Sequence, residues 1–151
     1  MSAKLPVSVL VVVHTAALYV LLLDRAARPG YWQSVTGSLD RYDEPTAQAA
    51  AREVREETGI DPASGVLERW NAVNTFEIYA QWRHRFVPGA VHNVEHVFGL
   101  RLPRVTPVSL SAGEHTACAW LPWREAAERC FSWSNRDAIR MLGECARASR
   151  G

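Results

Sequence analysis

The sequence has few cysteines, and they follow no recognisable pattern. Only 3 occur in 151 residues, at Cys118, Cys130 and Cys145, and none forms a Cys-x-x-Cys pair. An odd, widely spaced set indicates neither a disulfide framework nor a structural zinc site. We therefore expect a protein of a reducing compartment, the cytoplasm.

The chain also lacks an excess of charge of either sign. It carries 17 Lys and Arg against 16 Asp and Glu, a net charge of +1. Such a balance gives no bulk field that would recruit nucleic acid or an anionic membrane, so we expect neither as a partner. Any phosphate-bearing small molecule must be bound through the local placement of charges. The oligomeric state stays open.

Low-complexity segments and internal repeats are absent. Hydrophobic residues make up 48% of the chain and charged residues 22%, which is typical of a folded globular protein. A chain of 151 residues can bury a proper core, and we expect one domain over residues 1–151.

A single long apolar run, Val7–Leu23, approaches the length of a membrane span. The run is rich in valine and is interrupted by His14 and Thr15. Valine favours strands, so the pattern predicts two strands, Val7–Val13 and Leu18–Leu23, rather than a transmembrane helix.

Residues 47–58 predict a helix, because they contain no glycine or proline and are rich in alanine. Pro45 suits its first turn and Gly59 its end. Its alanines and Val54 are small enough to pack on a sheet; they are Ala47, Ala50 and Ala51.

Three carboxylates share one face of this helix. Glu53, Glu56 and Glu57 stand at positions i, i+3 and i+4, where like charges repel. Two readings are open at this point. The face is either a solvated surface compensated by Arg52 and Arg55, or the binding site of a hard divalent cation such as Mg²⁺.

The residues around these carboxylates form a longer pattern. Gly37 and Glu44 are followed by Arg-Glu-Val-x-Glu-Glu-x-Gly-Ile at residues 52–60. This resembles the Nudix box, the signature of the Nudix hydrolases. The spacing between Gly37 and Glu44 is one residue longer than in the usual box, which we interpret as an insertion in the loop 38–43.

The rest of the chain predicts strands with interspersed helices, an α/β (α+β) arrangement. The expected strands are Tyr31–Gly37, Gly65–Phe76, Glu77–Val87, Val94–Leu102 and Cys118–Leu121, and the expected helices are Trp123–Arg129 and Asn135–Arg147, the latter capped by Ser134. The resemblance implies the Nudix fold, a mixed β-sheet sandwiched between α-helices.

The resemblance also implies a metal site and its catalytic residues. A divalent ion, Mg²⁺ or Mn²⁺, would be held by Glu53, Glu56, Glu57 and Glu114. Glu114 follows a polar loop, and alone it would be read as an exposed loop residue. The catalytic candidates are Glu57, Glu114 and Arg52, with Arg52 expected to orient Glu56 through an i, i+4 pair.

Candidates for substrate binding combine cations with an aromatic ring and amides. Arg25 lies in a polar loop. Arg83 is predicted to alternate with Arg85 on a strand, facing either solvent or a triphosphate. Trp32 beside Gln33, and likewise Asn135 beside Trp133, suits stacking and edge recognition of a flat heterocycle. The proposed set is Arg25, Trp32, Gln33, Arg83 and Asn135.

A closer resemblance, nearly as long as the chain, depends on two runs. Trp32–Ser38 and Ser132–Arg136 are similar to those of the bacterial dihydroneopterin triphosphate pyrophosphatases. This implies an enzyme of folate biosynthesis that removes pyrophosphate from its substrate and leaves the monophosphate. The alternatives are a Nudix pyrophosphohydrolase of nucleoside triphosphates and a non-catalytic nucleotide-sensing module. The intact carboxylate face speaks against the last.

Overall fold

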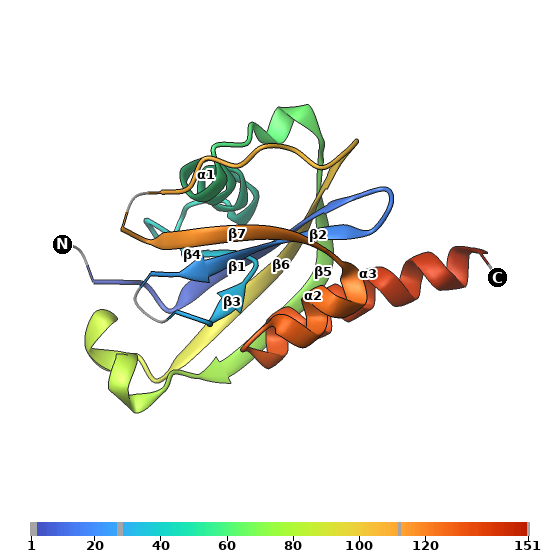
Figure 1. The fold of residues 1–151 in the computed structure, drawn as a ribbon. Helices are drawn as coiled ribbons and strands as arrows, with labels where there is room; N and C mark the ends of the chain where they lie inside the picture. Colours follow the sequence, from blue (N-terminus) through green and yellow to red (C-terminus); the bar gives the residue numbers. More distant parts are fainter. Residues whose placement is uncertain (1–2, 27–28, 112, 151) are drawn as a thin grey trace.

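The strands form one mixed sheet in the computed structural model, which describes residues 3–26, 29–111 and 113–150 (Figure 1). They are β1 (Val7–Thr15), β2 (Tyr19–Arg25), β3 (Trp32–Gln33), β4 (Val35–Ser38), β5 (Val66–Glu77), β6 (His92–Leu102) and β7 (His115–Pro122). The helices are α1 (Thr46–Thr58), α2 (Trp123–Arg129) and α3 (Trp133–Arg150), and two short 3-10 turns are η1 (Pro62–Ser64) and η2 (Ala80–Arg85).

Strand β1 is the centre of the sheet. It pairs in parallel with β6 along its whole length, and in antiparallel fashion with β4 and β2 on its other side. Its valine-rich run is buried on both faces, as the parallel centre of a sheet requires. The segment predicted to be strands rather than a membrane helix is therefore β1 and β2. Among the described residues no helix is both long and apolar enough to cross a membrane.

Helices cover the two faces of the sheet. Helix α1 lies on one side, and α2 and α3 lie on the other (Figure 1). Successive residues of β1 alternate between the two cores, with Val9 and Val11 facing α1 and Leu10 and Val12 facing α2 and α3. The expected mixed sheet between helices is confirmed.

Helix α1 is rotated relative to the face predicted for it. Ala50 and Val54 are buried as expected, but Ala47 is exposed and Ala49 takes its place. The rotation turns Glu53 toward the sheet together with the apolar residues. Gly59 ends the helix in the left-handed conformation, with φ at 70°, which favours glycine.

Three further local predictions were wrong. Arg25 is the last residue of strand β2 and does not lie in a loop. Glu77–Val87 is not a strand, because β5 ends at Glu77 and the chain turns through η2. The Arg83 guanidinium closes this turn by donating to the Ile78 carbonyl at 3.0 Å. The α3 cap is Ser132 rather than Ser134, since the Ser132 hydroxyl accepts the Asn135 backbone N–H at 3.3 Å.

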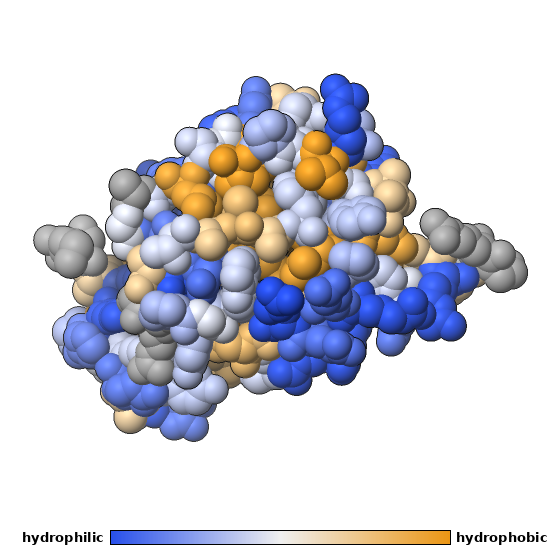
Figure 2. All heavy atoms as spheres, viewed as in Figure 1, coloured by the Kyte–Doolittle hydropathy of each residue, from blue (hydrophilic) through white to orange (hydrophobic). Residues whose placement is uncertain are grey.

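The segment 103–111 crosses over α1 and delivers the chain to β7 (Figure 1). Figure 2 shows apolar side chains gathered on this part of the surface, while the surface over α2 and α3 is hydrophilic. Val108 and Leu110 pack against the core beneath α1, and the Ser109 N–H donates to the Thr58 carbonyl at 2.8 Å. This anchoring holds the start of β7 next to the carboxylate face of α1.

Candidate functional site

Two of the three α1 carboxylates are buried against β4. Glu53 is 9% exposed and Glu57 is 4% exposed, so the reading of this face as a solvated surface is wrong for both. The Thr36 backbone N–H donates to Glu57 at 3.2 Å. The Glu53 carboxyl group lies directly on Gly37, where a Cβ atom would collide with it. Glu56 is exposed at the edge of the site.

Arg52 binds the carboxylates around it through several hydrogen bonds. Its guanidinium donates to Glu53 at 2.8 Å and to both oxygens of Glu44 at 3.1 Å. The predicted pair with Glu56 is present at 3.5 Å, longer than the other two. Arg52 therefore orients Glu53 and Glu44 at least as strongly as Glu56.

Glu44 keeps a place in this network despite the extra residue before it. It is buried, and its carboxylate also accepts the backbone N–H of Asp40 at 2.8 Å. The hydrogen bond from Arg52 lowers the pKa of Glu44 below its ordinary value. The extra residue is thus accommodated in the exposed stretch 40–43, after the buried Leu39, and Glu44 acts by fixing Arg52.

Glu114 and His115 approach from the start of β7. The backbone there is fixed because His115 pairs with Arg25 on β2 and the Ala26 N–H donates to the Glu114 carbonyl at 2.8 Å. Glu57, Glu114 and His115 each offer one ligand atom, and these atoms lie within 4.8 Å of one another. Burial lowers the pKa of His115, which favours the neutral imidazole that a metal requires.

The protonation of these carboxylates is also perturbed. Burial raises the pKa of Glu57 well above its ordinary value, and the charges of Glu53 and Glu114 raise it further. Burial likewise raises the pKa of Glu53 to about 7. A buried group of like charges is stabilised by a cation between them, so the residues present fit a divalent ion bound through oxygen with one imidazole nearby.

Cations gather beside this acidic site. Partial burial and the positive charges of Arg25 and Arg85 lower the pKa of Lys4, while Glu53 and Glu114 act in the opposite direction. Lys4 is held next to Arg85 by backbone hydrogen bonds, including Lys4 N–H to the Arg85 carbonyl at 2.9 Å. Of the predicted pair of arginines, Arg85 joins this group. Arg83 instead forms an ion pair with Glu77 at 2.6 Å.

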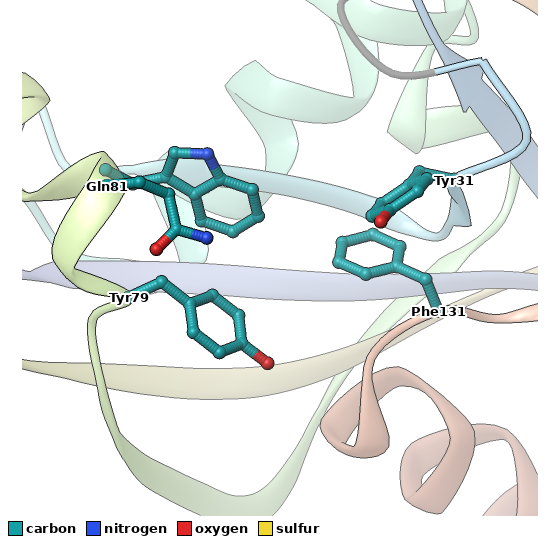
Figure 3. Close-up of a pocket in the computed structure, with 5 residues that line it drawn as sticks. Tyr31, Tyr79, Gln81 and Phe131 are labelled. Carbon is teal, nitrogen blue, oxygen red and sulfur yellow. The ribbon is translucent and has the colours of Figure 1, made fainter.

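An aromatic pocket opens next to the cations. Figure 3 shows Tyr31 and Phe131 on one side of the opening and Tyr79 and Gln81 on the other. Trp82 completes the lining, and the Arg25 guanidinium lies over its ring at 5.7 Å from the centroid. Because the backbone of Arg25 also pairs with that of His115, Arg25 joins the pocket to the acidic site.

The pocket residues were missed from the sequence. Nothing in the sequence assigned a role in binding to Tyr31, Tyr79, Trp82 or Phe131. They come from three separate segments of the chain, and no local pattern links them. His115, which follows Glu114, was likewise not predicted as a site residue. A strand start next to a polar loop is the only signal that the sequence gives for it.

Three other residues were predicted to bind substrate, Trp32, Gln33 and Asn135. Each contacts other residues of the protein near α3. The Trp32 ring packs against the core under α2, with the Arg129 guanidinium over it at 5.7 Å. Gln33 is buried and donates to the Thr36 hydroxyl at 3.3 Å. Asn135 is buried and accepts the Ser34 N–H at 2.8 Å. Their contact with a substrate stays a prediction.

The chain is similar to known proteins over most of its length. The NUDIX domain family model matches residues 4–142. The chain is 43% identical over 139 residues to the dihydroneopterin triphosphate diphosphatase of Escherichia coli strain K12, covering 90% of this chain and 91% of that protein. It is 35% identical to the protein of the same name from Haemophilus influenzae, covering 88% and 84%.

A solved structure is similar over nearly its full length. The E. coli dihydroneopterin triphosphate pyrophosphohydrolase superposes with a TM-score of 0.86 at 41% sequence identity. The match covers 93% of this chain and 97% of that chain.

Proposed function

This chain belongs to the NUDIX domain family, and on that basis we propose that it hydrolyses dihydroneopterin triphosphate to the monophosphate and pyrophosphate. The observation that carries the proposal is the identity of 43% to an enzyme named for this substrate, together with a site whose acidic, cationic and aromatic parts adjoin. The acidic part suits a divalent ion, and the cationic and aromatic parts suit the triphosphate and the heterocycle of the substrate. Cys118 and Cys130 carry free thiols, which supports action in the reducing cytoplasm.

The acidic part supports hydrolysis that depends on a divalent ion, Mg²⁺, with Mn²⁺ as a substitute. Glu53, Glu56, Glu57 and Glu114 would hold it, with His115 adjoining Glu57 and Glu114. An ion bound there neutralises phosphate charge and promotes attack by water. Arg52 keeps Glu53 in position, and either Glu57 or Glu114 accepts the proton of the attacking water.

The cationic and aromatic parts support binding of the two ends of the substrate. The cations Lys4, Arg25 and Arg85 adjoin the carboxylates, where a triphosphate would lie. The pocket between Tyr31 and Tyr79 presents ring faces to a flat heterocycle. Positioning and electrostatics of this kind supply most of the catalysis in phosphoryl transfer.

The test is a side-by-side measurement of pyrophosphate release from dihydroneopterin triphosphate, GTP, dGTP and ATP. We expect the highest kcat/KM with the pterin substrate and no turnover after removal of divalent ions with EDTA. A preference for one of the nucleotides would reject the pterin assignment and favour the nucleoside triphosphate alternative. Turnover that persists in EDTA would reject the metal site.

A further inference from the structure

A buried carboxylate outside the metal site, that of Glu95 on β6, has no cationic partner among the described residues. The side chain is 4% exposed. Two neutral groups contact it: the Asn74 amide donates to the carboxylate at 3.4 Å, and the Ser134 hydroxyl also forms a hydrogen bond with it. Burial of an unpaired carboxylate is costly. A buried carboxylate of this kind is a candidate for binding a ligand that donates hydrogen bonds to it.

The surroundings of Glu95 are polar and incompletely paired. Register places it beside Ser8 on β1 and opposite Asn74 on β5, so the three side chains share the sheet face that α3 covers. Asn93, two residues earlier on the same face, donates to the Ser8 hydroxyl at 2.8 Å. The carbonyl oxygen of the Asn93 side chain is buried without a partner, and so is the Ser34 hydroxyl. Buried polar atoms of native proteins are rarely left in this state.

Aromatic residues connect this polar surface with the pocket. Phe76 lies opposite Asn93 in the sheet, and its ring meets that of Trp133 edge-on at 6.4 Å between centroids. Trp133 begins α3 and is 46% exposed. Phe131, which lines the pocket, precedes it by two residues in the chain. Asn93 therefore lies between Phe76 and Glu95, so aromatic residues border the polar surface that contains the carboxylate.

This inference rests on the proposed function. It concerns the residue that recognises the edge of the heterocyclic ring of the substrate. We propose that the Glu95 carboxylate accepts hydrogen bonds from the 2-amino group and the adjacent ring N–H of the pterin. These two donors lie side by side, as the two oxygens of a carboxylate require. Guanine presents the same pair of donors and adenine does not. Glu95 therefore selects for the aminopyrimidinone edge, and other groups separate pterin from guanine.

The test uses the whole chain and compares substrates that have this aminopyrimidinone edge with one that lacks it. Glu95→Gln keeps the shape but replaces one acceptor oxygen with a donor. We expect kcat/KM to fall about 10²-fold for dihydroneopterin triphosphate and for GTP, with little change for ATP. Neopterin, which has no phosphate, should lose its binding in calorimetry. The matched control is Glu68→Gln, an exposed carboxylate on β5, which should behave like the wild type.

Equal losses on all three triphosphates, with neopterin still bound, would overturn the inference and make Glu95 a support for α3. If Glu95→Gln fails to fold, Glu95→Asp keeps the charge, withdraws it by one methylene, and should show the same selective loss. The proposed function fails separately, when the wild type does not release pyrophosphate from the pterin substrate. In that case the ratio of kcat/KM for GTP to kcat/KM for ATP, compared between the wild type and Glu95→Gln, still decides the role of Glu95.

Discussion

Gly37→Ala tests whether the close approach of β4 to α1 sets the position of a catalytic carboxylate. A Cβ atom at residue 37 would lie within 2.5 Å of all three atoms of the Glu53 carboxyl group, where ordinary contacts begin at 3.4 Å. The carboxyl group must therefore retreat by about 1 Å or more. That movement also strains its 2.8 Å hydrogen bond to Arg52.

A displacement of about 1 Å at a catalytic group can lower the rate about 10²-fold. We expect a loss of this size in kcat for Gly37→Ala, with the secondary structure preserved in circular dichroism. The matched control is Gly89→Ala, at a glycine with φ of 85° and open space around it. That change should lower stability by about 1 kcal/mol through the backbone and leave kcat unchanged.

A double-mutant cycle isolates the contact itself. In a Glu53→Ala background the obstructing carboxyl group is gone, so adding Gly37→Ala should cost no further activity. A kcat for Gly37→Ala within twofold of the wild type would refute the reasoning, because the Glu53 carboxylate would then be free to move without consequence. An equal additional loss in the Glu53→Ala background would refute it as well.

Four further predictions concern the metal site and the recognition of the substrate. Glu57→Gln should fold, lower kcat by at least ~10²-fold, and raise the melting temperature of the metal-free protein; a near wild-type rate at saturating Mg²⁺ would contradict the metal assignment. Arg52→Lys should lower kcat because a point charge does not reproduce the forked contacts to Glu44 and Glu53, and unchanged kinetics would make Arg52 a surface charge. Asn135→Ala should reduce kcat/KM for the pterin substrate more than for GTP, whereas equal losses would assign it to structure. Burial raises the folded-state pKa of Glu53 from the ordinary 4.5 to about 7. Between these two pH values the metal-free native state binds more protons than the unfolded state. The contribution of Glu53 to the free energy of unfolding therefore falls as the pH rises from 4.5 to about 7. The increase in melting temperature on adding Mg²⁺ should then be larger at pH 8 than at pH 6 in differential scanning fluorimetry, and an increase independent of pH would contradict it.

The sequence by itself determined the elements whose cause is local. Helix α1 follows from its alanines and from Gly59 at its end, and the i, i+3, i+4 spacing of three glutamates follows from helical periodicity alone. The valine-rich β1 was recognisable because a strand buried on both faces is apolar at every position. The box pattern added the expected chemistry of the site. The turn at η2 escaped prediction because nothing within residues 77–87 forbids a strand; only the pairing of β5 with β6 ends it there.

Contacts between distant segments were decided by the tertiary structure. Periodicity shows that Glu53 and Glu57 share a face, but their burial depends on how far α1 is rotated against β4. His115 reaches Glu57 only because β7 pairs with β2, and Tyr31 faces Tyr79 only because η2 replaces a strand. A local pattern fixes backbone conformation and the direction of a side chain along its own element. It contains no information on which element will lie opposite, because that is set by the packing of the whole chain.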